Sequence, residues 1–561
     1  MRNPPLFYIQ RKMKPLRRGD LFSFYCRRIP ISTNVKDISI KPKLDNSLTG
    51  TFIHPRLPSD KSLDSQESFP VMSISSHVFD NRLDFRYLLP TSPMEFRPIG
   101  RLPNELLSYI FLLIVNDPAE THLCTLTISH VCLQWRQVAL SNGALWARIV
   151  LTFPISDLKL SCANTWLSRS STFPLDILLD VRDPDWGWKE DNHRFRTENM
   201  QWIMQLLITH VERWQIVEMR ADTWAPICTF LWLSRGAKAA PMLEKISLSR
   251  CNAYYTSRDQ TFQPIALRRP IKLFGDIALE RIREVSLIGV HIDWSDPPLK
   301  NLTHLTFQYH AHDVMPTLEQ FQRILLACPT LLHLSVIGWG PILNGSSEEQ
   351  VSTTLSLPVL TRFSFGFMDT EYATRLLSLL DFPSLTEFKL EDVSKLVDPL
   401  DPVDISPLLE WFTTTYQISF HSTRLPLNQI RLMEFHGVDT NRKTFSDFLR
   451  QLTSLNHLGF YNIDDDIVRA LIPESSDFPP TQQLLEKDWV CPLLSELHCQ
   501  DVHPETILDI VSSRASTNFD FDLQKVTVEF RRDSAPSPGS TIHTRLVNAG
   551  VIIASTGPQN E

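Results

Sequence analysis

The chain has 561 residues, more than one hydrophobic core usually serves, so at least two domains are expected. Its net charge of −8 is unevenly placed, because residues 1–43 hold 11 Lys and Arg against 2 Asp and Glu, whereas the remainder holds 44 against 61. An acidic body lacks the clustered cations that phosphate contacts need, so nucleic acid is not an expected ligand. No segment approaches the ~18–20 apolar residues of a membrane span, so no membrane partner is expected.

Residues 1–95 are predicted to be a poorly ordered leader, basic at its start and rich in Pro and Ser. Its prolines interrupt any long helix. No apolar segment followed by a small-residue cleavage site is present, so the sequence indicates the cytoplasm or nucleus. Import into mitochondria by the Arg-rich, acid-poor start remains an open alternative.

Residues 96–151 are predicted to form a small helical module. Leu102, Leu106 and Ile110 recur every four residues, which places them on one face of a helix that Pro103 suits as a first-turn residue. A second helical stripe follows, and the chain then breaks at residues 141–143 before a Leu-Trp pair. The second stripe consists of Ile128, Val131, Trp135 and Val138.

This module resembles the F-box. The resemblance is carried by Leu102-Pro103 with Glu105-Leu106, then by Val131-Cys132 with Trp135, and finally by Leu145-Trp146. The resemblance implies that the module packs against the Skp-type adaptor of a Skp–cullin–F-box ubiquitin ligase and, through that adaptor, reaches a cullin. Its implied adaptor-binding residues are Leu102, Pro103, Leu106, Ile110, Val131, Trp135, Leu145 and Trp146. Internal packing is an alternative role for Val131 and Trp135.

A short pattern recurs behind the module: an apolar residue, two spacers, an apolar residue, one spacer and another apolar residue. Leu302/Leu305/Phe307 and Leu331/Leu334/Val336 are two of its eleven instances. The last two positions alternate, so each instance predicts a short strand with one buried face. Helical stretches are expected between instances, among them residues 318–327, 372–380, 445–452, 467–471 and 506–512.

This region resembles the divergent leucine-rich repeats found behind F-boxes. The resemblance implies a curved parallel sheet with outer helices, an irregular solenoid over residues 209–530. Residues 152–208 are expected to be a connecting segment that packs on the solenoid, and residues 531–561 a tail or cap. The predicted fold class is therefore α/β, and the alternative architecture is a domain of separate βα units.

A protein substrate is expected to bind the outward residues of the strands and the turns that follow them. Aromatic and charged side chains at such positions are frequent anchors of interfaces. The candidate substrate-binding residues are Trp294, Tyr309, Trp339, His436 and Tyr461, with Arg250, His291, His310 and Asp501 as further candidates.

No pattern in the sequence recommends catalytic, cofactor or metal chemistry. Phosphate-binding loops, nucleophile elbows and zinc-protease motifs are absent. The nine cysteines form no Cys-x-x-Cys pair, which suits a reducing compartment. Cys132 and Cys499 fall at positions predicted to be buried, so packing is favoured over zinc binding for the Cys/His groups around them.

Three functions follow from these observations. The favoured one is a non-catalytic substrate receptor of a Skp–cullin–F-box ligase, with an unknown protein as its substrate. The alternative is a leucine-rich-repeat scaffold for protein–protein interaction outside any ligase. A hydrolase that uses a histidine of the repeat region is the third.

Overall fold

The computed structural model describes residues 102–117, 123–187, 192–250, 260–343, 354–397, 403–418, 425–472, 489–515, 523–530 and 535–555. The chain divides into two compact units. The first comprises Met1–Leu106 with Asn560–Glu561, of which only Leu102–Leu106 are described, and the second comprises Leu107–Gln559.

The helical module consists of α3 (Asn104–Val115), α4 (Cys124–Val131), α5 (Leu133–Ser141) and the 3-10 turn η2 (Gly143–Trp146). Leu107 and Phe111 of α3 are fully buried, and Val138 and Ala139 of α5 are almost completely buried. Polar contacts join the helices as well: Asn142 donates its side-chain amide to Ser108 Oγ at 2.5 Å, and Thr125 Oγ1 donates to the carbonyl of Leu145 at 2.9 Å. The predicted short helices of this region are confirmed.

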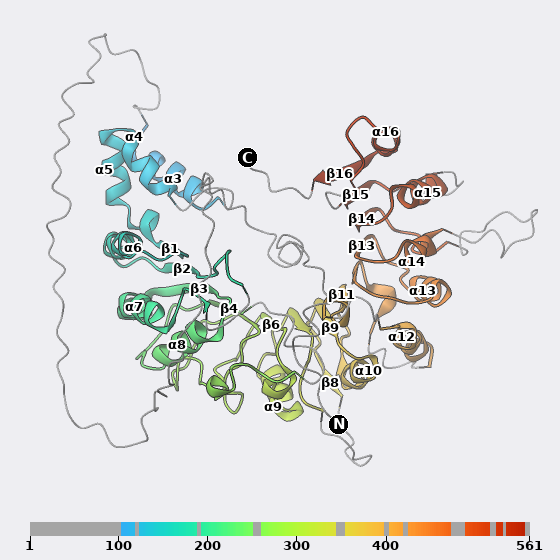
Figure 1. Ribbon diagram of the computed structural model, residues 1–561, viewed down its shortest axis with the longest axis horizontal. Coiled ribbons are helices and arrows are strands. Elements are labelled where there is room, and N and C mark those ends of the chain that lie inside the picture. Colours follow the sequence, from blue (N-terminus) through green and yellow to red (C-terminus); the bar gives the residue numbers. More distant parts are fainter. Residues whose placement is uncertain are drawn as a thin grey trace, which may run out of the picture. The chain divides into compact units, whose positions relative to one another are not determined.

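Fourteen strands of the described residues form one parallel sheet whose order follows the chain (Figure 1). The strands are β1 (Arg148–Thr152), β2 (Leu175–Asp180), β3 (Trp214–Arg220), β4 (Lys245–Ser249), β5 (Glu284–Ile288), β6 (His304–Gln308), β7 (His333–Ile337), β9 (Arg362–Phe367), β11 (Glu387–Asp392), β12 (Leu432–His436), β13 (His457–Tyr461), β14 (Glu496–Gln500), β15 (Lys525–Phe530) and β16 (Val551–Ser555). A separate two-stranded pair joins β8 (Leu355–Ser356) to β10 (Leu380–Asp381).

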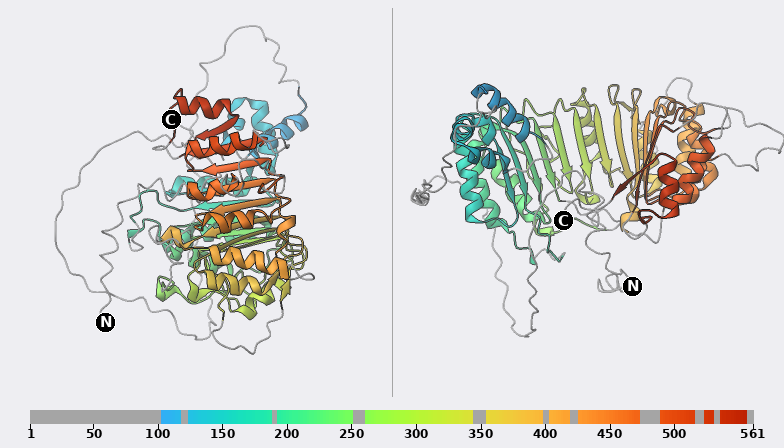
Figure 2. Two further views of the ribbon diagram at one scale, coloured as in Figure 1. Left: turned by 90° about the vertical axis from the view of Figure 1, so that its right-hand side faces the viewer. Right: turned by 90° about the horizontal axis from the view of Figure 1, so that it is seen from above.

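Helices lie along one face of the sheet, within most of the connections between successive strands (Figure 2). They are α6 (Asp157–Arg169), α7 (Thr197–Leu207), α8 (Trp224–Ser234), α9 (Leu318–Leu326), α10 (Thr370–Ser378), α11 (Ser394–Val397), α12 (Ser406–Ile418), α13 (Arg442–Leu449), α14 (Asp465–Val468), α15 (Pro504–Ala515) and α16 (Thr541–Asn548). Among the described residues, no helix has the length and apolar character needed to cross a membrane. The predicted α/β class with repeating strand–helix units of the leucine-rich-repeat type is confirmed.

The core lies between the sheet and its helices, and the apolar positions of the repeated pattern fill it. Leu334 pairs in register with Phe363, and Val336 with Phe365, so the inward residues of neighbouring strands stack. The ring of Phe363 continues this stack onto Phe388 of β11 at 5.8 Å between centroids. No single repeat buries its own apolar face, so each strand depends on its neighbours for stability.

The sheet extends beyond the predicted residues 209–530. β1 and β2 precede this range and β16 follows it, so the sheet takes in described residues of the expected connecting segment, 152–208, and of the expected tail or cap, 531–561. Val211, Trp214 and Ile216 form another instance of the repeated pattern, which predicts that Ile216 is buried, but Ile216 is half-buried. A register shift in β3 places Ile216 opposite Asp176, so Val217 and Met219 point inward instead.

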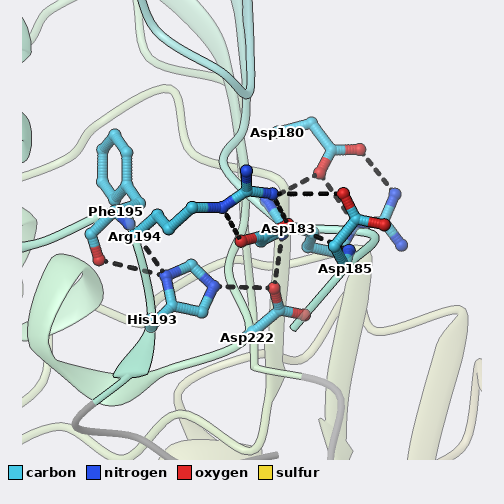
Figure 3. A network of polar contacts seen from close by, with 8 residues as sticks. Asp180, Asp183, Asp185, His193, Arg194, Phe195 and Asp222 are labelled. Atoms are coloured by element: carbon cyan, nitrogen blue, oxygen red, sulfur yellow. Dashed lines mark hydrogen bonds and ion pairs between the residues drawn. The ribbon is translucent and has the colours of Figure 1, made fainter. Parts of the chain in front are cut away.

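A buried polar network holds the segment that follows β2 against the end of β3 (Figure 3). Asp222 accepts hydrogen bonds from the Nε2 of His193 at 2.9 Å and from the backbone N–H of Asp183 at 2.7 Å. Asp183 in turn pairs with Arg194. The side chains of His193 and Asp222 are 2% and 6% exposed. Burial alone lowers the pKa of His193, but hydrogen bonds to Asp222 and to the Phe195 carbonyl, with the charges of Asp222 and Asp183, raise it overall.

This network predicts a pH-dependent contribution to stability. Because the folded-state pKa of His193 lies above its value of 6.5 in the unfolded chain, the contribution is complete below pH 6.5 and is lost as the pH rises through the folded pKa. We expect the stability advantage of the wild type over His193→Gln to shrink between pH 6 and pH 9. Urea unfolding of both proteins across this range measures the difference in their free energies of unfolding. A wild-type advantage that grows with pH would contradict the raised pKa of His193.

Candidate protein-binding surfaces

The helical module exposes a stripe of apolar side chains along α3. Leu106, Ile110 and Leu113 are 51%, 38% and 56% exposed, and Tyr109 beside them is 61% exposed. Their spacing of three and four residues places them on one face of the helix, opposite the buried Leu107 and Phe111.

The junction of α4 and α5 exposes further apolar side chains. Val131 at the end of α4 is 56% exposed, and Leu133 at the start of α5 is 73% exposed. Leu140 lies seven residues after Leu133, on the same face of α5, and is also exposed. Large apolar side chains that remain in water at such a density mark surfaces that bind another protein. We name the exposed apolar residues of α3, α4 and α5 the module surface: Leu106, Tyr109, Ile110, Leu113, Val131, Leu133 and Leu140.

The structure places the predicted adaptor-binding residues in two groups. Pro103, Leu106, Ile110 and Val131 are exposed, whereas Leu102 is half-buried. Trp135 is half-buried too, and its ring packs on Phe111 with centroids 4.8 Å apart, so it belongs in part to the internal core.

Leu145 and Trp146 require a correction, because the structure buries both within the chain. Their side chains are 1% and 0% exposed. Trp146 donates its Nε1–H to the carbonyl of Ala139 at 2.8 Å, packs edge-on against Trp166 and lies under the Arg169 guanidinium. This pair therefore joins the module to the first strand–helix unit of the sheet and offers no side-chain surface to a partner.

Sequence reasoning missed Tyr109, Leu113, Leu133 and Leu140 as members of the module surface. The signal was present in α3, since Leu113 continues the spacing of Leu106 and Ile110 by one turn. Cys132, predicted to be buried, is exposed instead, because it caps α5: its Sγ accepts the backbone N–H of Trp135 at 3.5 Å.

The predicted substrate-binding residues also divide into two groups. Trp294, Tyr309 and Trp339 are buried, which corrects their assignment as contact residues. Trp294 donates its Nε1–H to the carbonyl of Val314, and Tyr309 donates its hydroxyl to Glu391. The ring of Trp339 packs against the ring of His312, which precedes β7 in the chain, and against the ring of Tyr372 on α10.

Three further candidate contact residues, which lie in the turns after strands, are also buried. Arg250, His291 and His310 are buried as well, and burial lowers the pKa of both histidines to about 4. The two histidines are therefore neutral at physiological pH, and they pack inside the chain rather than contact a partner. Asp501 is half-buried at the end of β14.

His436 and Tyr461 remain on the face of the sheet that the helices do not cover, which we name the strand face. Their rings stack in parallel with centroids 4.1 Å apart, and Tyr461 also stacks on His498 of the next strand at 5.1 Å. Cys499, the following residue, points into the core as predicted, and burial raises the pKa of its thiol. Among the described residues, no three His, Cys, Asp or Glu side chains converge as a metal site would require.

The comparisons with known proteins agree with the geometry of the module. Residues 99–152 match the family model described as F-box-like. No curated protein matches the chain. The chain thus carries an F-box-like domain at residues 99–152, followed by a long parallel sheet of the leucine-rich-repeat type.

Proposed function

We propose that this chain is a substrate receptor of a Skp–cullin–F-box ubiquitin ligase. The observation that carries the proposal is the module surface, which exposes large apolar side chains on the helices of an F-box-like domain. The F-box suggests a Skp-type adaptor as the partner that covers this surface, and a cullin as the subunit reached through the adaptor. The repeat sheet behind it is then the part that selects a substrate.

Burial of the module surface explains why an adaptor would bind tightly. Covering apolar area contributes about 25 cal/mol per Å², and a few large side chains usually carry most of the energy of an interface. The interface would not involve Leu145 and Trp146, which instead hold the module on the sheet.

The role proposed for the chain is positioning rather than catalysis. In this class of ligase the transfer of ubiquitin takes place on other subunits. The receptor contributes proximity, because it holds a substrate lysine near the charged ubiquitin carrier.

A double substitution in the module surface tests the proposal. We expect Leu106→Glu/Val131→Glu to weaken binding of a purified Skp-type adaptor at least ~100-fold, because two exposed apolar contacts would each lose about 1.5 kcal/mol or more. Isothermal titration calorimetry measures the affinity, and circular dichroism shows whether the variant is folded.

Leu326→Glu is the matched control, since Leu326 is 66% exposed on α9 and lies outside the module. It should bind the adaptor as the wild type does. Adaptor binding that survives the double substitution would contradict the proposal. A wild-type chain that co-purifies with protein partners but with neither adaptor nor cullin would favour the scaffold function instead.

A further inference from the structure

The strand face differs in charge between its two halves. From β1 to β9 the outward residues of the strands balance, with four carboxylates and four cations. Several of them pair across strands: Arg148 with Asp176 at 3.6 Å, and Lys245 with both Glu218 at 3.1 Å and Glu284 at 3.8 Å. The balanced residues are Arg148, Asp176, Asp180, Glu218, Arg220, Lys245, Glu284 and Arg362.

From β11 to β15 the outward residues carry an excess of negative charge. Five carboxylates face two lysines, and a cation contacts three of the carboxylates: Arg362 of β9 pairs with Glu387, Lys389 with Glu391 at 2.9 Å, and Lys525 with Glu496 at 3.5 Å. We name the carboxylates of this half the acidic strand surface: Glu387, Glu434, Glu496 and Glu529, which reach the surface, and Glu391, which is buried.

Two outward histidines of this half do not offset the negative charge. His436 and His498 are held against the Tyr461 ring, and burial lowers the pKa of each. They are therefore neutral at physiological pH. Gly459 allows this arrangement, since a Cβ at that position would lie 2.8 Å from the ring of Tyr461. The stacked rings of His436, Tyr461 and His498 therefore form an uncharged area of the strand face between the carboxylates.

A cavity of about 640 Å³ lies where this part of the sheet ends. Asp501 directly follows β14 and Phe530 ends β15, and both line the cavity. Asp465 and Glu505 add two more carboxylates to its wall, of which Glu505 pairs with Arg545 at 2.6 Å, and Ile542 and Phe530 add apolar surface. Carboxylates next to apolar side chains suit lysine or arginine, whose stems pack on apolar groups while the charged end meets an anion.

We propose that the acidic strand surface and this cavity bind a Lys- and Arg-rich segment of a partner protein. The inference rests on the proposed function, in which that partner is the substrate, and it names the substrate's chemistry. A phosphorylated or otherwise acidic segment is disfavoured, because it would bring like charge to a face with five carboxylates. Charge complementarity of this kind contributes both specificity and a faster association rate.

The test measures binding of fluorescein-labelled octalysine to the full-length chain by fluorescence anisotropy, with octaglutamate as the opposite probe. We expect the wild type to bind octalysine more tightly than octaglutamate, although the basic residues 1–43 offer octaglutamate an opposite charge. The variant Glu434→Gln/Glu496→Gln/Asp501→Asn, which removes three charges from the acidic half and its cavity, should bind octalysine at least tenfold more weakly.

The control variant Asp176→Asn/Glu218→Gln/Glu284→Gln removes the same number of charges from the balanced half and should change the affinity less than twofold. Equal weakening by both variants would overturn the proposal, because the probe would then sense only the net charge of the chain. Octaglutamate binding as tight as octalysine binding, or no octalysine binding, would overturn it too. Adaptor affinity, measured on both variants, should be unchanged, and Leu106→Glu/Val131→Glu should still bind octalysine, so the two proposals fail separately.

Discussion

At pH 6, where the raised pKa keeps His193 protonated, replacing Asp222 with alanine is expected to lower the free energy of unfolding by about 3–5 kcal/mol, the usual cost of removing one partner of a buried charge pair. The substitution would leave the Nε2 of His193 and the backbone N–H of Asp183 buried without an acceptor (Figure 3). An unsatisfied buried donor costs the full price of its desolvation. Urea denaturation followed by circular dichroism measures the loss.

Asp185→Ala provides the matched control. Asp185 lies in the same segment and contacts Arg194, but its side chain is 76% exposed, so its loss should change stability by no more than about 0.5 kcal/mol. Equal effects of the two substitutions would show that the network contributes nothing beyond exposed ion pairs.

Trp146→Ala is expected to destabilise the chain by about 3–5 kcal/mol, the range measured when a buried aromatic side chain is truncated. The substitution removes the ring that packs against Trp166 and leaves the Ala139 carbonyl without its donor. Adaptor binding should weaken as a consequence, through loosening of the module and not through a lost contact. Thermal unfolding by differential scanning calorimetry measures the first effect.

Trp202→Ala is its control, because Trp202 is 57% exposed on α7, and the change should stay within about 0.5 kcal/mol. A Trp146→Ala protein as stable as the wild type that nevertheless loses the adaptor would mean that Trp146 contacts the adaptor directly. That result would contradict the buried position described above.

The repeat pattern predicted most of the sheet because spacing alone sets which strand residues point inward. Leu334 and Val336, for example, occupy the buried positions that the pattern assigns to them. β1 was overlooked although Trp146, Ile149 and Leu151 have the same spacing, because the F-box resemblance assigned Trp146 to a partner surface. One residue thus belonged to two motifs at once. The continuous apolar run of α8 carries little periodicity, which explains why that helix was not predicted.

Side-chain roles were harder to predict than strand positions. The sequence identified Leu106, Ile110 and Val131 correctly as apolar residues of the module helices, but burial depends on which helix faces pack together, and adaptor binding itself remains a prediction. Trp294 and Trp339 were assigned to a surface because they follow strands. Their large rings contact residues about twenty to thirty positions further along the chain, such as Val314 and Tyr372, and a single sequence does not reveal such contacts.

The strand order of the sheet bears on how such a chain diversifies. Each strand pairs only with the units immediately before and after it in the sequence. Duplication or deletion of one strand–helix unit therefore leaves the pairing scheme of all the others intact. The number of units can therefore change over evolution while the helical module ahead of the sheet keeps its own sequence.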